Sequence, residues 1–562
     1  MRAETSPPAA GFRTAAGSRG SVGLRTAVAR IAAGRTGVTR VSAICAGLAL
    51  ASSALAPPAA LAQDLENGRE VYDRWCAECH GAEGAGDGPA ADYMLPRPRD
   101  FVQARYQVRT TGPGELPTDE DIMHILEVGM PGTAMPAWPN LTESEKRDVT
   151  AYIKSFSRFF ENADPQPMDF AADPGGGEEA LASGREVYRE LECWKCHGES
   201  GRGSGQSTPT LEDWRDVPIR AADLTEPWNF NGGAGAEAVY RRMMTGLDGT
   251  PMPAYSDAVA SDVVTTDEMW HLAHYVESLA PTPEPRTSDL ISAARIEGEL
   301  PSSPDDGAWD EARAAFVPLV GQVIETPRAF APTVDGVWVR ALHDGERVAL
   351  RLEWGDPSNS PDTTWNEWQA RIVESLHADE AELSPDEPMT DGLAVQFPAE
   401  MPEGAERPYF LMGESNDPVT LWTWDSRAGA VEAQGRGLGS ISSLSGGDLS
   451  AESVWDGGHW EVVLARSLAG GVEGAISLAE GVVTPVAFFA WDGSSAETPE
   501  RGSVSSWIYL YLEEPTSSNV VIAPIVALLL TGGLLWWLVR GAQRRSARSG
   551  SVPAGDPATE GA

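Results

Sequence analysis

The spacing of apolar and polar residues changes twice along this chain. Up to residue 282 it predicts amphipathic helices separated by polar, glycine-rich loops. From 305 to 515 apolar and polar residues alternate in short runs, two of which flank an Asp-Gly turn in VWVRALHDGERVALRLEW. This part is expected to be an all-β domain, most simply a sandwich. Further strands are expected in GLAVQF, PYFLMG, VTLWTW, HWEVVLARSL, TPVAFFAWDG and SVSSWIYLYLE.

A third pattern is a continuous apolar run near the end of the chain. Residues 520–539, VVIAPIVALLLTGGLLWWLV, carry no charge and are long enough to cross a hydrocarbon core of about 30 Å. They predict a transmembrane helix. The arginine-rich segment RGAQRRSAR follows, so the positive-inside rule places the tail, residues 540–562, in the cytoplasm and the preceding domains in the periplasm.

The first 62 residues have the pattern of an export signal. They contain seven arginines and one acidic residue before and around an apolar stretch that ends in Ala-Leu-Ala, which predicts cleavage after Ala62. The positive region is long, so an uncleaved anchor is the alternative. Cys45 falls inside the apolar stretch and is interpreted as an ordinary residue of that stretch without a chemical role.

The remainder of the chain is strongly acidic. The whole sequence has 83 acidic and 42 basic residues, a net charge of −41, which excludes nucleic acid as a partner. The only lysines are Lys146, Lys154 and Lys195. An acidic surface poor in lysine is interpreted as adaptation to salt.

One module occurs twice in the helical part. GREVY occupies 68–72 and 184–188, and each copy leads to a C-x-x-C-H motif, a Met-Pro loop (GTAMPAW or GTPMPAY) and a closing helix that begins at a threonine cap. The expected domains are residues 63–162 and 178–282. The linkers FFENADPQPMDFAADPGGG and APTPEPRTSD are rich in proline, glycine and acidic residues.

The C-x-x-C-H motifs suit covalent haem. Two thiols at this spacing reach the two vinyl groups of one porphyrin, and the adjacent histidine then lies under the iron as an axial ligand. The alternatives are a zinc site of four cysteines shared between the copies, or a redox-active dithiol, and both leave the histidines unexplained. The residues expected to hold two haems c are Cys76, Cys79 and His80, and Cys193, Cys196 and His197.

The sixth iron ligand is expected from the Met-Pro loops. Met135 and Met252 occupy matching places in the two copies, and a His/Met pair favours electron transfer over oxygen chemistry. Met130 is the competing ligand in the first copy. Other candidates are His124, His271 and His274 as second histidine ligands, whereas Met243 and Met244 are expected in a helix core.

CAECHG with GTAMPAW, and CWKCHG with GTPMPAY, resemble the motifs of class I cytochrome c domains. The resemblance covers residues 64 to 280. It implies a small helical fold around each haem, with electron transfer at the exposed haem edge.

Residues 305–515 resemble, more weakly, the haem b-binding gamma subunit of ethylbenzene dehydrogenase and dimethylsulfide dehydrogenase. The resemblance rests on DGLAVQFP, PYFLMGESNDPVTLWTWDS, GHWEVVLARSL and AFFAWDG. It implies one non-covalent haem b between a methionine, here Met412, and a lysine. No lysine follows Lys195, and the expected place reads Ser503-Val504. His343, His377 and His459 are the histidines left as alternative ligands; a five-coordinate iron or a haem-free docking domain are the other outcomes.

Together these patterns predict two all-α cytochrome c domains, an all-β sandwich and a C-terminal transmembrane helix. The favoured function is a dihaem c-type cytochrome anchored in the inner membrane, which transfers electrons as haem subunit or partner of a molybdenum oxidoreductase with molybdopterin and iron-sulfur subunits. The alternative is a stand-alone tethered carrier that serves periplasmic redox proteins and has a haem-free docking or carbohydrate-binding sandwich. An enzyme such as a two-haem peroxidase is disfavoured, because a methionine from each Met-Pro loop would occupy the sixth coordination position that a peroxidase iron needs for its substrate.

Overall fold

A computed structural model describes residues 63–280, 287–375, 389–402, 404, 406–515 and 518–549. The export signal expected in residues 1–62, most of the linker after residue 280, His377 and the end of the tail lie outside these ranges.

The first module is helical. Its closing helix begins at Thr142, whose hydroxyl caps the helix while Glu145 completes a capping box, as the sequence predicts. The first helix crosses the closing helix at Gly68, where a Cβ atom would lie 2.1 Å from the carbonyl oxygen of Asp148. The helices are α1 (Leu65–Trp75), α2 (Ala77–His80), α3 (Asp119–Val128) and α4 (Glu143–Ser155), with 3₁₀ turns at Ala91–Tyr93 and Arg158–Phe160.

The second module repeats this arrangement. Thr265 caps its closing helix with the same capping box, and Gly184 takes the place of Gly68 at the helix crossing. Met243 and Met244 are buried in its core, as expected. The helices are α5 (Glu178–Glu190), α6 (Trp194–His197), α7 (Ala236–Thr245), α8 (Ser256–Ala260) and α9 (Thr266–Ser278), with 3₁₀ turns at Thr208–Thr210 and Pro227–Asn229.

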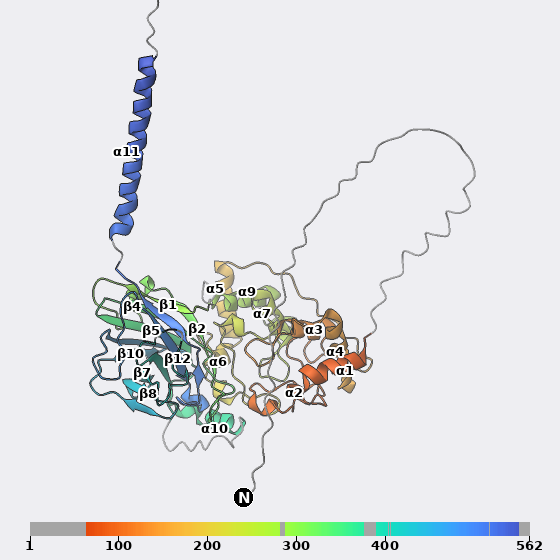
Figure 1. The fold of residues 1–562 in the computed structure, drawn as a ribbon. Helices are drawn as coiled ribbons and strands as arrows, with labels where there is room; N and C mark the ends of the chain where they lie inside the picture. Colours follow the sequence, from red (N-terminus) through yellow and green to blue (C-terminus); the bar gives the residue numbers. More distant parts are fainter. Residues whose placement is uncertain are drawn as a thin grey trace, which may run out of the picture. The chain divides into compact units, whose positions relative to one another are not determined.

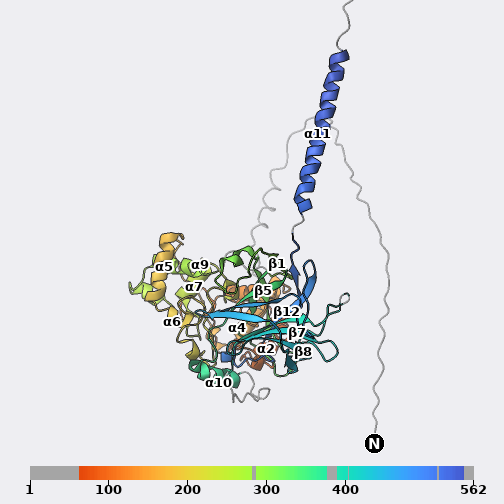
Figure 2. The same ribbon diagram turned by 90° about the vertical axis from the view of Figure 1, so that its left-hand side faces the viewer.

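The strands of the third part gather into one β domain (Figures 1 and 2). The hydrogen-bonded order is β10-β11-β5-β4-β1-β14-β12-β6-β7-β8-β9, and β1 is parallel to both of its neighbours. The strands are β1 (Leu290–Arg295), β2 (Ala315–Pro318), β3 (Val320–Gly321), β4 (Gly336–His343), β5 (Arg347–Gly355), β6 (Gly392–Pro398), β7 (Val419–Asp425), β8 (Gly429–Gly435), β9 (Ile441–Ser443), β10 (Ser450–Trp455), β11 (His459–Ser467), β12 (Val483–Trp491), β13 (Ser503–Val504) and β14 (Ile508–Leu512).

The two halves of this strand path share one core. The ring of Trp424 on β7 lies 5.7 Å from that of Trp354 on β5 and 4.8 Å from that of Trp460 on β11, centroid to centroid. Such packing across two faces is what a sandwich requires. The domain also contains helix α10 (Asn366–Ser375) and 3₁₀ turns at Gly307–Glu311, Thr363–Trp365 and Gly493–Ser495.

One expected strand is wrong. PYFLMG, residues 408–413, forms a turn, in which Met412 has φ +60° and Gly413 has φ +76°. Both angles lie in the left-handed region, which a strand cannot contain. The apolar run therefore packs as a folded loop instead of a strand.

The last described element is α11 (Ser518–Ser549), a single long helix (Figure 1). Within it the candidate span Ile522–Ser546 contains an 18-residue stretch with a mean hydropathy of 2.2, none of which is buried. Among the described residues this is the helix long and apolar enough to cross a membrane. It agrees with the apolar run at 520–539, extended at its C-terminal end.

Candidate haem-binding sites

The first C-x-x-C-H motif lies in a tight turn between α1 and α2. Cys76 ends α1, and His80 is the last residue of α2 with 8% of its surface exposed. The His80 Nδ1 atom lies 2.9 Å from the carbonyl oxygen of Arg99. A carbonyl can only accept, so Nδ1 carries the proton and Nε2 keeps its lone pair. Burial lowers the pKa of His80, which favours this neutral imidazole.

The second motif has the same geometry. His197 Nδ1 lies 2.9 Å from the carbonyl oxygen of Ala222, and burial likewise lowers the pKa of His197. In each module a buried tyrosine fixes the turn after the histidine: Tyr72 donates to Gly81 O at 2.7 Å, and Tyr188 donates to Gly198 O at 2.6 Å. Both copies thus present an oriented imidazole with a free Nε2, the form in which histidine ligates iron.

The Met-Pro loops also match, hydrogen bond by hydrogen bond. The amide of Met135 donates to Thr133 Oγ1 at 3.1 Å, and the amide of Met252 donates to Thr250 Oγ1 at 3.2 Å. The carbonyl of Met135 accepts from the amide of Met130, whereas that of Met252 accepts from Leu247. Met130 therefore corresponds to a leucine in the second copy, which disfavours it as a ligand common to both sites.

A cavity of about 170 Å³ joins these groups in the first module. Its lining includes both thiols of the motif, His80, Met130 and Met135, together with the apolar side chains of Trp138 and Ile122. A set of two thiols, one imidazole and one thioether around an apolar cavity fits a covalent haem with two axial ligands.

Part of this lining comes from the second module, which the sequence did not predict. Asp213, Arg215, Ile219 and Gly249 border the same cavity, beside Arg97 and Arg99 of the first module. The Arg215 guanidinium also donates to the carbonyl of Pro98 at 3.2 Å. The two modules therefore meet at the first site, and they place guanidinium groups at its edge.

Within the described ranges, the cysteines of the two motifs do not come together as one four-cysteine site. Burial raises the pKa of Cys76 to about 12 and that of Cys193 to about 11. Among the residues that the structure describes, the groups of three or more side chains close enough to share a metal ion contain no cysteine. This arrangement gives no support to a shared zinc site.

The competing histidines of the two modules lie elsewhere. His271 Nδ1 is 3.1 Å from Ser183 Oγ, and His274 Nε2 is 3.0 Å from Asp173 Oδ1. His124 is exposed on α3. None of the three lines the cavity of the first module.

Met412 lies in a small apolar cluster of the β domain. It is fully buried, and its neighbours there include Phe489, Trp491 and Val504. Val504 belongs to the Ser503-Val504 segment in which the second ligand of a haem b was expected, so the structure brings these two segments together. The side chains available here as ligands of a haem b iron are therefore the Met412 thioether on one side and a serine and a valine on the other.

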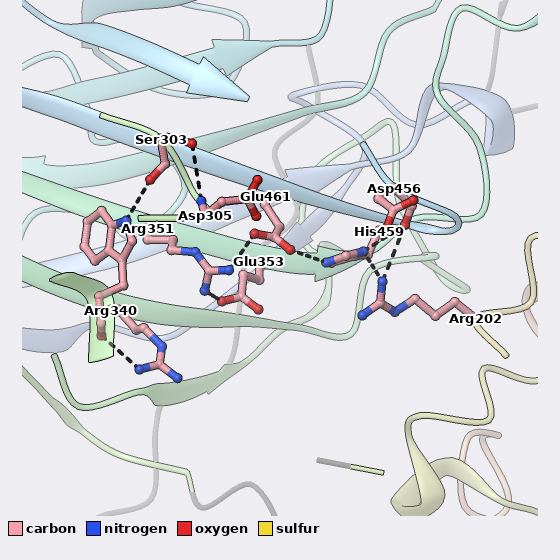
Figure 3. A network of polar contacts seen from close by, with 10 residues as sticks. Arg202, Ser303, Asp305, Arg340, Arg351, Glu353, Asp456, His459 and Glu461 are labelled. Atoms are coloured by element: carbon pink, nitrogen blue, oxygen red, sulfur yellow. Dashed lines mark hydrogen bonds and ion pairs between the residues drawn. The ribbon is translucent and has the colours of Figure 1, made fainter. Parts of the chain in front are cut away.

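The two described histidines of the β domain lie on β4 and β11, not on the strands that surround Met412. His343 is fully buried on β4. His459 on β11 is held by polar partners: its Nε2 lies 2.9 Å from Glu461 Oε1, and its Nδ1 lies near Asp456 O and the Arg202 guanidinium (Figure 3).

The fold and the duplicated motif of residues 63–280 match what cytochrome c domains have in common. The cytochrome c family matches residues 65–157 and 181–280, and the ethylbenzene dehydrogenase family matches residues 306–440. The chain therefore carries two cytochrome c domains, whose cofactor is covalent haem c, followed by a domain like the gamma subunit of ethylbenzene dehydrogenase.

Two curated relatives carry the names of reductase subunits. A protein named as a respiratory nitrate reductase haem subunit, from Haloferax mediterranei, is 27% identical over 211 residues, which cover 38% of this chain and 68% of the relative. The chlorate reductase gamma subunit of Ideonella dechloratans is 26% identical over 217 residues, covering 38% and 80%. A solved chain of the reducing HAO-like protein complex of Kuenenia stuttgartiensis is 43% identical, covering 38% and 96%, with a TM-score of 0.37.

Proposed function

We propose that this protein is a membrane-anchored, periplasmic dihaem c-type cytochrome that passes electrons between a molybdenum oxidoreductase of the DMSO reductase family and the respiratory chain. The observation that carries the proposal is the duplicated geometry: two C-x-x-C-H turns with the same histidine orientation and the same Met-Pro loop. Two such sites in series form a relay. Relatives named as haem subunits of nitrate and chlorate reductases support the kind of partner.

In this proposal each site has a defined set of ligands. Cys76 and Cys79 hold the first haem and Cys193 and Cys196 the second, through thioether bonds, while His80 with Met135 and His197 with Met252 bind the two irons. The covalent haem supplies a one-electron redox change near neutral pH.

The chain's own residues set the conditions for that change. The carbonyls of Arg99 and Ala222 hold the imidazole rings in one orientation, so little rearrangement accompanies a change of charge. The buried tyrosines and apolar cavity walls limit the access of water. At the cavity edge Arg97 and Arg215 are paired with Asp92 and Asp213, which leaves the guanidinium group of Arg99 to favour the more negative, reduced state.

Purification in mild detergent tests the partner. We expect a large molybdopterin subunit and an iron-sulfur subunit to co-purify with the protein, with molybdenum detectable in the preparation by mass spectrometry. A preparation that contains this chain alone and no molybdenum would contradict the proposed partner. The haem assignment would stand, because it depends on this chain only.

The second candidate, a stand-alone tethered carrier with a haem-free β domain, is favoured by one observation. Met412 is fully buried among apolar side chains and the domain contains no lysine. Here Met412 is a core residue and the domain serves for docking.

A pyridine haemochrome spectrum, combined with acid-acetone extraction, separates the two candidates. Both predict two covalent haems c for each chain. One additional extractable haem b would support the molybdenum enzyme subunit, and its loss in Met412→Ala, but not in Met401→Ala at an exposed methionine of the same domain, would place it at Met412. No extractable haem would favour the stand-alone carrier.

A further inference from the structure

Three aspartates from separate loops meet inside the β domain, away from the C-x-x-C-H motifs. Asp356 follows β5, Asp391 precedes β6, and Asp492 follows β12. Because Gly392 and Trp491 are paired across β6 and β12, Asp391 and Asp492 lie at the same end of these strands. One carboxylate oxygen of each aspartate lies within 4.8 Å of those of the other two.

The three aspartates are buried and form no ion pair with any described residue, although the Arg220 guanidinium partly offsets the rise in the pKa of the adjacent Glu497. Asp356 is 1% exposed, and Asp391 and Asp492 are 0% exposed. A fourth carboxylate, Glu497, is 4% exposed and accepts from the amide of Asp492 at 3.0 Å. Burial and mutual repulsion raise the pKa values of Asp356 and Asp391 well above their usual range and that of Glu497 to about 7.

Backbone amides fix the orientation of each carboxylate. Ser358 donates to Asp356 Oδ1 at 3.1 Å, and Ser494 donates to Asp492 Oδ1 at 2.7 Å. Asp391 accepts from Gly493 at 2.9 Å, from Ser360 at 2.6 Å, and from the indole of Trp460 at 3.1 Å. The side chains are therefore held in place before any ligand arrives.

Three buried oxygen atoms at this place lack any hydrogen-bond partner in the described part of the chain. They are Asp356 Oδ2, Asp492 Oδ2 and Ser494 Oγ. A buried acceptor that is left unsatisfied destabilises the fold, more so when it is charged, so native proteins satisfy such atoms with water or an ion. A single water molecule has two hydrogens and cannot donate to all three of these oxygen atoms, whereas one cation can accept a lone pair from each.

We propose that Asp356, Asp391 and Asp492 form a binding site for a divalent calcium ion, with Ser494 Oγ as a neutral oxygen donor. All of the available donors are oxygen atoms, which hard cations prefer, and calcium accepts many carboxylate and hydroxyl oxygens in irregular geometry. The ion would join the β5 side of the domain to the β6–β12 side.

A second acidic group in the same domain shows the contrast. Glu353, Glu461 and His459 are also close enough to share a metal ion, but the guanidinium of Arg351 pairs with both glutamates (Figure 3). The positive charge that this group needs is already present in the chain. Among the described residues, none forms an ion pair with the three aspartates.

The proposed site supports a contact with the second cytochrome module. Ser494 belongs to the turn Gly493–Ser495. The side-chain amide of Gln369 donates a hydrogen bond of 2.7 Å to the Gly493 carbonyl in this turn. Arg220 of the second module donates to Ser495 Oγ at 3.1 Å. Arg220 lies two residues before Ala222, whose carbonyl holds His197, so the turn buttresses the loop that orients this histidine.

Thermal unfolding of the full-length protein in detergent, after treatment with EGTA, tests the site. At a calcium concentration of 100 times Kd we expect the Tm of the β domain to rise by roughly 5–10 °C. Calcium measured by mass spectrometry after dialysis should reach one ion per chain. The same concentration of magnesium should give a smaller shift, because magnesium demands stricter geometry.

The variant Asp492→Asn gives the sharper result. It should bind no calcium and show no calcium-dependent shift, yet in EGTA its Tm should stay close to that of the unmodified protein, since the amide oxygen of asparagine still accepts from the Ser494 amide. The matched control Asp310→Asn, which removes an exposed carboxylate of the same domain, should keep the full shift. An equal calcium shift in Asp492→Asn, the absence of bound calcium in the unmodified protein, or binding of magnesium alone would overturn the proposal.

Discussion

Replacing Met135 with alanine is expected to leave both haems attached and to lower the reduction potential of one of them by roughly 0.1–0.3 V. Covalent attachment depends on Cys76 and Cys79, so the haem content should not change. The thioether ligand favours the reduced iron, and axial ligands as a class span about 0.8 V of potential. Potentiometric titration followed in the α band measures the shift, and the ferric near-infrared band of the iron–thioether bond should lose half of its intensity.

The matched control is Met130→Leu. This change gives the first module the residue that the second module carries at the equivalent position, Leu247, whose amide makes the same hydrogen bond to the Met-Pro loop. Its potential and spectrum should match those of the unmodified protein. Met252→Ala should reproduce the effect of Met135→Ala on the other haem. If Met130→Leu instead loses half of the thioether band and Met135→Ala keeps all of it, Met130 is the iron ligand of the first module.

The parts of the candidate sites that lie close together along the chain are the ones that the sequence predicts. The cysteine and histidine positions follow from one motif, and the structure places their imidazoles in equivalent hydrogen bonds. The closing helices begin at Thr142 and Thr265 as expected, because capping is decided by the first turn alone.

Other parts depend on contacts between distant segments and could not be inferred. The carbonyls that orient His80 and His197 belong to Arg99 and Ala222, in loops with no signal of their own. The aspartate cluster draws one residue from each of three loops, and an aspartate beside Gly or Pro is read as an ordinary turn residue. Arg215 reaches the first site from the second module, and no pattern within either module marks it.

The expected strand at residues 408–413, which the structure does not contain, shows a different limit of prediction from sequence. PYFLMG has the composition of a strand, yet Met412 takes a left-handed conformation there and its side chain packs into a small core. Apolar composition records that a segment is buried, whereas its backbone path is set by the neighbours that bury it.

Gly184 is the first residue of the second GREVY segment, and Gly184→Ala should destabilise the second module by about 3 kcal/mol. The added Cβ would lie 2.1 Å from the carbonyl oxygen of His271 and 2.7 Å from the Cβ of Tyr275, so α5 and α9 would have to separate. Overpacking costs about 1–3 kcal/mol, and a backbone obstacle, which cannot rotate away, places this site at the upper end. Alanine gains about 1 kcal/mol in helix propensity, which the clash outweighs.

Thermal unfolding of this module, followed by the Soret absorption of its haem, should show a midpoint lower by roughly 10–20 °C. Gly68→Ala should do the same in the first module, since its Cβ would meet Asp148 O at the same distance. Gly177→Ala is the control, because its Cβ meets nothing within 4 Å; Gly177 is the N-cap of α5, where alanine is less favourable than glycine, so the expected cost is about 0.5–1 kcal/mol. If Gly184→Ala proves as stable as Gly177→Ala, the two helices do not cross in contact at this glycine. Close packing between α5 and α9 would then not explain why a glycine stands at this position in both copies.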